Sequence, residues 1–401
     1  MKYNQQFKNF LSSIFRLICI GFSIVFLDSI VLAQRNNFII NTSATSFSEQ
    51  VFSSLFKPEV RPAANNITVN VFASGLNAPR GLKFGSDRNI YVAEAGLGGT
   101  VSTTGQCQQV PAPVGPWLGG NTARILRFNQ NGAVSTVAQN LPSTQAAIGD
   151  RMGIADIAFL DGRLYALLAG GGCSHGHPEI PNSVLRINSN GSWSPIANIS
   201  SFVMNNETAN PEPDDFEPDG TPYSMVAARG ALYVVESNHG QLLRVETNGN
   251  ISRVIDTSAS QGHSVPTALT YDENFYVGNL GTFPLVAGSS KILKVKSSGK
   301  FTVVAGGLTA VLGAAFDEED NLYVLETTTN NPFPTPGTGR VVRVRRNGTL
   351  EEIVTGLNFP TAMTFGPDGK LYISNWGFGP PIPGLGEILQ VTMPRHHDDD
   401  D

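Results

Sequence analysis

The sequence carries little charge and no surplus of basic side chains. Only 15% of its 401 residues are charged, and 27 Lys and Arg residues stand against 33 Asp and Glu residues, for a net charge of −6. Because binding to nucleic acid calls for a basic surface, no nucleic-acid partner is expected. Apolar residues make up 41% of the chain, enough for a large core at this length, so global disorder is excluded.

Long hydrophobic runs are confined to the start of the chain. Basic residues precede the apolar run Leu17–Leu27, and Val31-Leu32-Ala33 matches a signal-peptide cleavage pattern. A membrane-spanning helix needs about 20 apolar residues, and Asp28 ends this run early. Residues 1–33 are therefore predicted to be a signal peptide, and the mature chain to be periplasmic or extracellular without a transmembrane segment. An uncleaved membrane anchor is the alternative.

Cysteine is also scarce. The chain has three cysteines, and removal of the signal peptide takes away Cys19, which leaves Cys107 and Cys173. An exported chain folds in an oxidising compartment, so these two are predicted to form a disulfide. A pair of thiolate metal ligands is the alternative.

What the chain has in quantity is glycine and a sixfold repeat. Each repeat has an apolar strand, a turn, a strand with a central tyrosine, a loop and a strand of alternating polarity. The six tyrosines are Tyr91, Tyr165, Tyr233, Tyr276, Tyr323 and Tyr372. Asn-Gly or Ser-Gly turns, which are hairpin signals, follow the third strands of the first five repeats. A four-stranded unit that recurs every 40–50 residues or so is typical of a β-propeller blade.

The last repeat stops after its third strand, near Met393, and its missing strand is found near the start of the mature chain. The segment that begins at Ile67 matches Ile353–Pro360, which leads from blade five into blade six. We therefore predict an all-β, six-bladed propeller over residues 67–393, closed by the N-terminal strand. A flexible segment, 34–66, precedes it, and a disordered acidic tail, 394–401, with His396 and His397, follows it.

The lengths of the links between strands predict at which end of the propeller the functional site lies. Links between first and second strands, and between third and fourth strands, are short. The long insertions all fall in the other two kinds of link, which share one end of the axis; they are 95–122, 170–182, 198–221, 280–290, 327–339 and 377–386. Loops on a rigid scaffold commonly carry binding and catalytic residues, so we expect the site at this end.

All four histidines of the folded body lie in links at this same end, on three consecutive blades. His175 and His177 form a His-x-His pair, His239 follows Glu236 by three residues, and His263 precedes the inner strand of blade four. Because imidazole is a common ligand for transition metals, the four histidines and Glu236 are predicted to hold a metal, with Glu236 and His239 also catalytic. Hydrogen bonding between long loops is the alternative role.

Carboxylates at the same end suggest a second cation. A polar residue follows five of the six blade tyrosines by three positions, and the loop 207–220 carries six carboxylates. Ca²⁺ prefers such oxygen ligands, so a calcium ion at this acidic rim is one prediction. The alternatives are capping of the next loop by the strand-end residues and simple solvation of the acidic loop. No nucleotide cofactor is evident.

The inner strands add two charged residues near the axis. Asp156 is the one acid at a position that is otherwise small or Ser, and Arg80 is the one base a position earlier. Both are predicted to be catalytic, and a structural pairing of Asp156 with Arg80 or Arg151 is the alternative. Tyr223, Trp376 and Phe378 are predicted to bind a flat aromatic substrate, although each could equally pack within its own loop.

Several segments resemble known propeller families. Pro360–Tyr372 resembles the repeats of NHL-type and soluble quinoprotein-dehydrogenase-type propellers. The exported chain over about 67–393 resembles the ScyD/ScyE family of cyanobacteria, through Val71–Leu82, Asp219-Gly-Thr-Pro-Tyr223 and Glu236-Ser-Asn-His239. The resemblance implies a periplasmic protein linked to late steps of the biosynthesis of scytonemin, an indolic-phenolic pigment.

Together these observations lead to one main hypothesis and three alternatives. The main hypothesis is a metal-dependent oxidoreductase that acts on an indolic or phenolic substrate, where a redox-active copper or iron would oxidise a phenolate. The alternatives are a non-enzymatic binding module for pigment precursors or proteins, a calcium-dependent hydrolase resembling lactonases, and a quinone-cofactor dehydrogenase. The metal, the exact substrate and the oligomeric state do not follow from the sequence.

Overall fold

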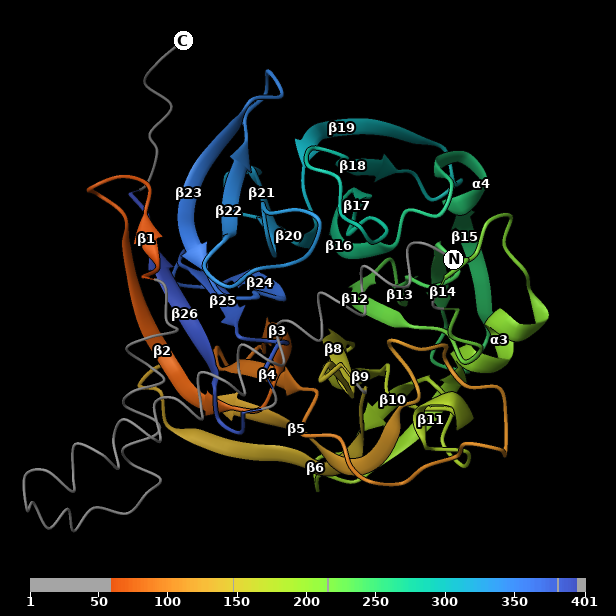
Figure 1. Ribbon diagram of the computed structural model, residues 1–401. Helices are drawn as coiled ribbons and strands as arrows, with labels where there is room; N and C mark the ends of the chain where they lie inside the picture. Colours follow the sequence, from red (N-terminus) through yellow and green to blue (C-terminus); the bar gives the residue numbers. More distant parts are fainter. Residues whose placement is uncertain (1–58, 147, 215, 381, 395–401) are drawn as a thin grey trace, which may run out of the picture. The chain divides into compact units, whose positions relative to one another are not determined.

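The computed structural model describes residues 59–146, 148–214, 216–380 and 382–394. These residues form six antiparallel sheets arranged around a central axis (Figure 1), which confirms the predicted six-bladed propeller. The predicted signal peptide 1–33, most of the segment 34–66 and the tail from 395 onward, with its two histidines, lie outside the described residues.

Each blade is a four-stranded meander that runs from the axis outward. The first three blades are β3 (Pro79–Phe84), β4 (Ile90–Glu94), β5 (Leu118–Phe128) and β6 (Val134–Gln145); β8 (Ile154–Leu160), β9 (Arg163–Leu168), β10 (Ser183–Ile187) and β11 (Trp193–Asn198); and β12 (Pro222–Ala228), β13 (Ala231–Glu236), β14 (Gln241–Val245) and β15 (Ile251–Asp256). A two-residue strand, β7 (Arg151–Met152), extends blade one.

The other three blades follow the same plan. They are β16 (Pro266–Asp272), β17 (Asn274–Asn279), β18 (Ser290–Val295) and β19 (Phe301–Leu308); β20 (Val311–Phe316), β21 (Leu322–Glu326), β22 (Gly339–Val344) and β23 (Leu350–Leu357); and β24 (Ala362–Phe365), β25 (Leu371–Asn375) and β26 (Gly386–Thr392) with β2 (Thr68–Leu76). Three short helices lie in the links: a 3₁₀ turn at Cys173–His175, α3 (Ile199–Asn205) and α4 (Ser258–Gln261).

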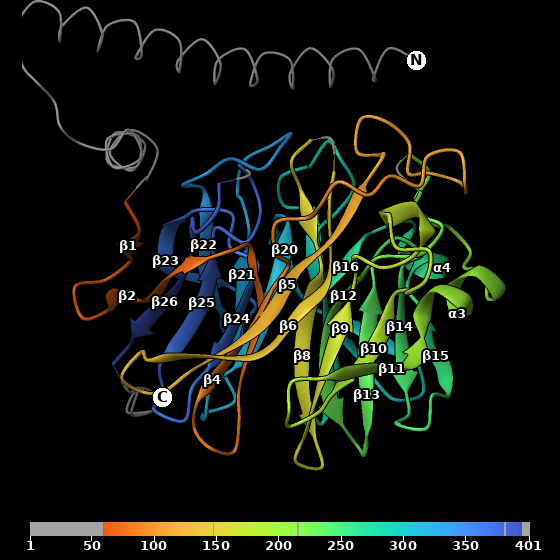
Figure 2. The same ribbon diagram turned by 90° about the horizontal axis from the view of Figure 1, so that it is seen from below.

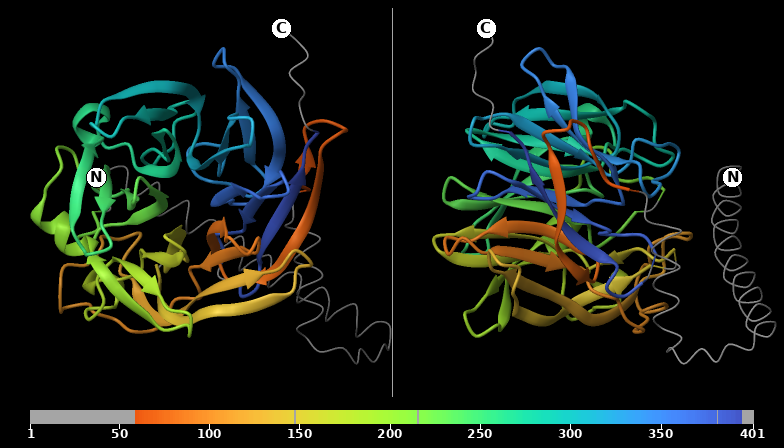
Figure 3. Two further views of the ribbon diagram at one scale, coloured as in Figure 1. Left: turned by 180° about the vertical axis from the view of Figure 1, so that it is seen from behind. Right: turned by 90° about the vertical axis from the view of Figure 1, so that its left-hand side faces the viewer.

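The N-terminal strand closes the ring as predicted. β2 pairs antiparallel with β26, with Val69 opposite Val391, and the two strands lie side by side in Figure 3. This pairing covers the outer edge of the last blade, which would otherwise be an open sheet edge. The end of the segment expected to be flexible is also ordered, because Arg61 and Pro62 form β1 and pair with β23 of blade five.

The repeated tyrosines join neighbouring blades. Tyr91 packs edge-on against Phe159 with ring centroids 5.0 Å apart, and Tyr323 packs in the same way against Phe365 at 5.0 Å. Tyr276 and Tyr372 make equivalent contacts with Phe316 and Phe84. Such edge-to-face pairs are stabilising beyond the area they bury, so the same contact recurs between successive blades.

The long insertions lie at one end of the axis, and we call this end the mouth. Figure 2 shows the long links of blade one (orange) and blade five (blue) on the same upper side, opposite the short turns. A disulfide joins Cys107 in the insertion of blade one to Cys173 in that of blade two. None of the described helices is long and apolar enough to span a membrane.

Candidate functional site

A ring of six residues surrounds the axis just inside the mouth. Five inner strands contain a β-bulge at the same register, immediately after the residue that pairs with the end of the second strand. The bulged residues, with Thr361 at the matching position of blade six, form what we call the axial ring: Arg80, Ala155, Tyr223, Thr267, Leu312 and Thr361. Bulges redirect side chains and are frequent beside active sites.

Tyr223 and Arg80 are the largest polar members of the axial ring. The Tyr223 hydroxyl donates to the carbonyl of Thr361 in blade six, at the long distance of 3.4 Å, so this side chain crosses the axis from blade three. Arg80 lies beside the same phenol and donates to the carbonyl of Arg151 and, at 3.4 Å, to the carboxylate of Asp150. Burial raises the pKa of Tyr223 to about 12, so its phenol remains a hydrogen-bond donor at neutral pH.

Asp156 lies one position further along its inner strand and is 5% exposed. Its two carboxyl oxygens accept the backbone N–H groups of Ile157 and Met225, both at 2.8 Å, and Met225 belongs to blade three. Burial raises the pKa of Asp156, and these bonds together with the charge of Lys83 offset only part of that effect. The alternative role for Asp156, a pairing with Arg80 or Arg151, is not found in the described part of the chain, where Arg80 contacts Asp150 instead.

A glycine makes room for this carboxyl group. A Cβ atom on Gly81 would stand 1.9 Å from Oδ1 of Asp156. The small residue aligned here in the sequence therefore has a steric reason in blade one.

Aromatic side chains adjoin the axial ring between blades six and one. Phe359 packs against Phe378 at 4.6 Å and against Trp376 at 5.8 Å between ring centroids. A Cβ atom on Gly377 would lie 2.2 Å from Oγ1 of Thr361, so this segment contacts the ring directly. Of the predicted substrate-binding residues, Tyr223 and Phe378 are half-buried, whereas Trp376 is almost completely buried.

The predicted metal-binding histidines contact glutamates and a backbone carbonyl at the mouth. Three of them face glutamates: Nε2 of His175 lies 3.4 Å from Glu217, Nδ1 of His239 lies 3.1 Å from Glu236, and Nε2 of His263 lies 2.5 Å from Glu212. The fourth, His177, bonds the Ser143 carbonyl of blade one at 3.0 Å. This is the loop-bridging role that the sequence left as the alternative.

The acidic loop takes part in the same contacts. Glu212 and Glu217 pair with histidines, and Asp219 accepts the backbone N–H and the hydroxyl of Ser174. Among the described residues, no group of three or more His, Cys, Asp or Glu side chains could hold a metal ion. Binding of a transition metal at the histidines, or of calcium at this rim, stays a prediction without a ligand set.

Glu236 and its counterparts at the ends of the second strands accept backbone N–H groups from neighbouring links. Glu236 is fully buried and accepts the N–H groups of Thr221, Asn238 and His239. Glu94 and Asn375 accept backbone N–H groups from the corresponding links in their blades. Both carboxylate oxygens of Glu236 therefore already accept backbone N–H groups, and this arrangement does not support the predicted catalytic role.

The Glu236–His239 pair predicts a pH-dependent stability. Burial alone would lower the pKa of His239, but the Glu236 charge overcomes it and raises the pKa above the usual 6.5, with help from Glu217 and against Arg253. Burial likewise opposes ionisation of Glu236, yet His239 and the bonded N–H groups hold its pKa below 4.5. The pair's stabilisation is therefore complete between about pH 4.5 and 6.5, is lost above this range as His239 deprotonates and is lost below it as Glu236 protonates.

Chemical unfolding of the wild type and His239→Gln across pH 4–9 measures this effect. The difference in free energy of unfolding between the two should shrink as the pH rises through the pKa of His239. Comparison with the variant matters because burial lowers the pKa of His177, whose contribution has the opposite pH dependence. A difference that does not change with pH would contradict the prediction.

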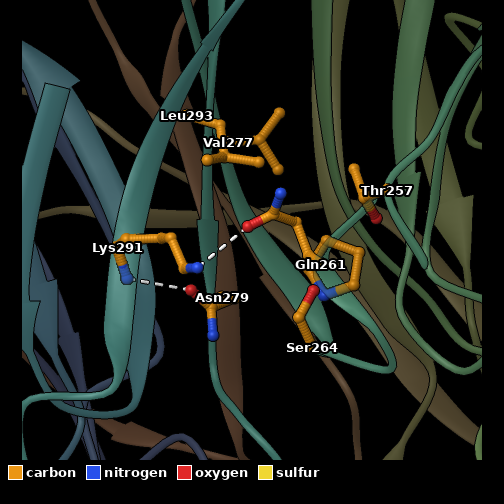
Figure 4. Close-up of a pocket in the computed structure, with 8 residues that line it drawn as sticks. Thr257, Gln261, Ser264, Val277, Asn279, Lys291 and Leu293 are labelled. Atoms are coloured by element: carbon orange, nitrogen blue, oxygen red, sulfur yellow. Dashed lines mark hydrogen bonds between the residues drawn. The ribbon is translucent and has the colours of Figure 1, made fainter. Parts of the chain in front are cut away.

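A small pocket lies between blades three and four (Figure 4). It is lined by Thr257, Gln261, Ser264, Pro266, Val277, Asn279, Lys291 and Leu293. The Lys291 ammonium donates to the Gln261 side chain at 2.8 Å, and the Lys291 backbone N–H donates to Asn279. Three of the polar residues that line the pocket, Gln261, Asn279 and Lys291, are therefore already hydrogen-bonded to one another.

Sequence reasoning missed Asp150 and Phe359, and it gave Arg151 only as a possible partner of Asp156. Asp150 and Arg151 fall in a link with no motif, and only the fold brings them beside Arg80. A signal for the axial ring was nevertheless present, because Pro79-Arg-Gly81, Pro266-Thr-Ala268 and Pro360-Thr-Ala362 share a Pro-x-small pattern.

Known structures share the fold at low sequence identity. No protein-family model matches the chain, and no curated protein matches its sequence. A gluconolactonase from Xanthomonas campestris superposes with a TM-score of 0.52 and 12% identity, covering 84% of this chain and 95% of its own. A Bacteroides thetaiotaomicron protein of unknown function reaches 0.51 with 13% identity, covering 83% and 76%. Identities this low establish the six-bladed propeller fold alone.

Proposed function

We propose that this protein binds a small aromatic molecule, phenolic or indolic, at the mouth of its propeller. One observation carries the proposal: the axial ring presents Tyr223 and Arg80 beside the aromatic cluster Phe359, Trp376 and Phe378. Hydrogen-bonding groups next to apolar rings are the usual composition of a small-molecule site. The resemblance to the ScyD/ScyE family makes precursors of the scytonemin pigment the natural ligands to test.

Two features support export of the protein. The charge and cleavage pattern of residues 1–33 predicts a signal peptide. The Cys107–Cys173 disulfide is typical of proteins from oxidising compartments.

A binding experiment with a neutral probe tests the proposal. Isothermal titration of the purified protein with indole-3-acetamide should give stoichiometric binding. Phe378→Ala should weaken it about tenfold, as expected when an aromatic contact is lost. Phe283→Ala is the matched control, because Phe283 is 41% exposed and stacks on Phe333 elsewhere in the links. Absence of binding, or equal weakening by both variants, would refute the proposal.

The metal-dependent oxidoreductase is the second candidate. It is favoured by one contact pattern, since Glu217 faces His175 and its charge also raises the pKa of His239. These groups do not complete a metal site among the described residues, so no catalytic step is assigned to them. Elemental analysis of the wild type and of the variants His175→Ala and His239→Ala tests this candidate. A stoichiometric metal in the wild type that is lost in the variants would favour the oxidoreductase.

The calcium-dependent hydrolase finds less support in the same geometry. That alternative expects acid and amide oxygens at the top of the axis. The axial ring instead offers a guanidinium group, a phenol and two threonine hydroxyls, and both oxygens of the neighbouring Asp156 accept backbone N–H groups.

A further inference from the structure

Two buried arginines stand side by side at the mouth. Arg80 is 8% exposed and Arg151 is 6% exposed, and the Arg80 guanidinium contacts the Arg151 carbonyl. The Nε atom of Arg151 is buried and has no hydrogen-bond partner. Buried polar groups are nearly always satisfied, and an unsatisfied one in a native structure calls for an explanation.

The acids near these arginines leave a surplus of positive charge. Asp150 pairs with Arg80, and its side chain is 38% exposed, so water screens this ion pair. Asp156 gives its oxygens to backbone N–H groups and has Lys83 as a neighbouring cation. Three basic side chains, Arg80, Arg151 and Lys83, therefore face two acidic ones. Asp150 is partly exposed to water, and the oxygens of Asp156 are already hydrogen-bonded to backbone N–H groups.

We propose that the ligand carries a carboxylate, bound by Arg80 and Arg151 with the hydroxyl of Tyr223, while its ring contacts Phe378. This inference rests on the proposed function and specifies the chemical class of its ligand as an aromatic carboxylate. A monoanion matches a surplus of about one positive charge, and guanidinium groups bind carboxylates through paired N–H donors. Among the described residues, the hydrogen bond that the Tyr223 hydroxyl donates is the long 3.4 Å contact to the Thr361 carbonyl, which a ligand could replace.

Comparison of a charged ligand with its neutral counterpart tests the inference. Indole-3-acetate and indole-3-acetamide share the ring and the size of the side group but differ in charge. Isothermal titration should show the acid binding at least about tenfold more tightly, as charge-assisted hydrogen bonds to buried groups would give. In Arg151→Met this preference should fall to about one, with binding of the amide retained.

Two further variants control for folding and for general electrostatics. Arg151→Met should fold, because Nε has no protein partner to lose; Arg80→Met should also remove the preference, with thermal melting to verify that the variant is folded. Arg163→Met removes an exposed positive charge from the first residue of β9, next to a short turn at the opposite end of the axis, and should leave the preference unchanged.

Each outcome supports or overturns a separate claim. Equal affinity for acid and amide in the wild type, or a preference that survives both mouth variants, overturns the carboxylate while the aromatic site stands. A preference reduced equally by Arg163→Met means a general charge effect and also overturns it. If neither probe binds, the proposed function fails and this inference fails with it.

Discussion

Replacement of both Cys107 and Cys173 by serine should lower the free energy of unfolding more than any other change considered for this protein. The bridge spans 66 positions of chain, and closing a loop of that length restricts the unfolded state by about 4 kcal/mol. Guanidinium-induced unfolding of the wild type and the double-serine variant, followed by tryptophan fluorescence, measures the loss.

Reduction provides an independent control for the same bond. Wild-type protein in a reducing agent should unfold at the midpoint of the double-serine variant, and the variant itself should not respond to the reductant. The prediction fails if oxidised wild type and variant have the same stability, because the insertions of blades one and two would then be held by their other contacts. Among these is the hydrogen bond from Thr103 to the Cys173 carbonyl.

Glu326→Ala should be the most damaging change within a single blade. Its carboxylate is fully buried, accepts the Thr309 N–H at 2.6 Å and pairs with Nε of Arg340 at 2.6 Å. Removal of the Glu326 carboxylate leaves the Thr309 N–H without its acceptor and leaves Arg340 with Glu352 alone, which costs about 1–3 kcal/mol. The free energy of unfolding from urea titration should fall by that amount.

Arg340 itself supplies the matched control. Its Nη1 atom also pairs with Glu352 at 2.8 Å, but the Glu352 side chain is 50% exposed. Glu352→Ala should cost less than about 1 kcal/mol, because water screens an exposed pair. Similar losses for both variants would show that burial does not decide the strength of these contacts. Glu326→Gln, which can still accept from Thr309, should fall between the two.

The fold followed from local patterns repeated six times. Six tyrosine strands, the glycine turns and the match between the segment at Ile67 and that at Ile353 were sufficient to predict the closed ring. Each of these signals is carried by neighbours in the chain, through hairpin geometry or alternating burial, so it survives without knowledge of distant contacts. The strand and turn pattern of one blade would not have identified a propeller, but its sixfold repetition did.

The candidate site was only partly accessible in the same way. The sequence placed the histidines, Glu236 and the aromatic residues in the links of one end, and the structure shows which of them meet. His239 meets Glu236 at a spacing of three residues, which sequence inspection can notice. His175 meets Glu217, and His263 meets Glu212, only because links of adjacent blades cross at the mouth.

By itself the sequence determined the all-β class, the number of blades, the strand that closes the ring and the end at which the insertions gather. Tertiary structure alone decided that His175 and His263 pair with glutamates, that Asp156 bonds to backbone rather than to arginine, and that Arg80 lies beside Arg151 and Tyr223. The reason is that hairpins depend on residues close in sequence, whereas the side chains at the axis come from blades that are far apart in the chain; Tyr223 and Thr361, for example, are separated by 138 positions. Their contacts exist only once the ring has closed.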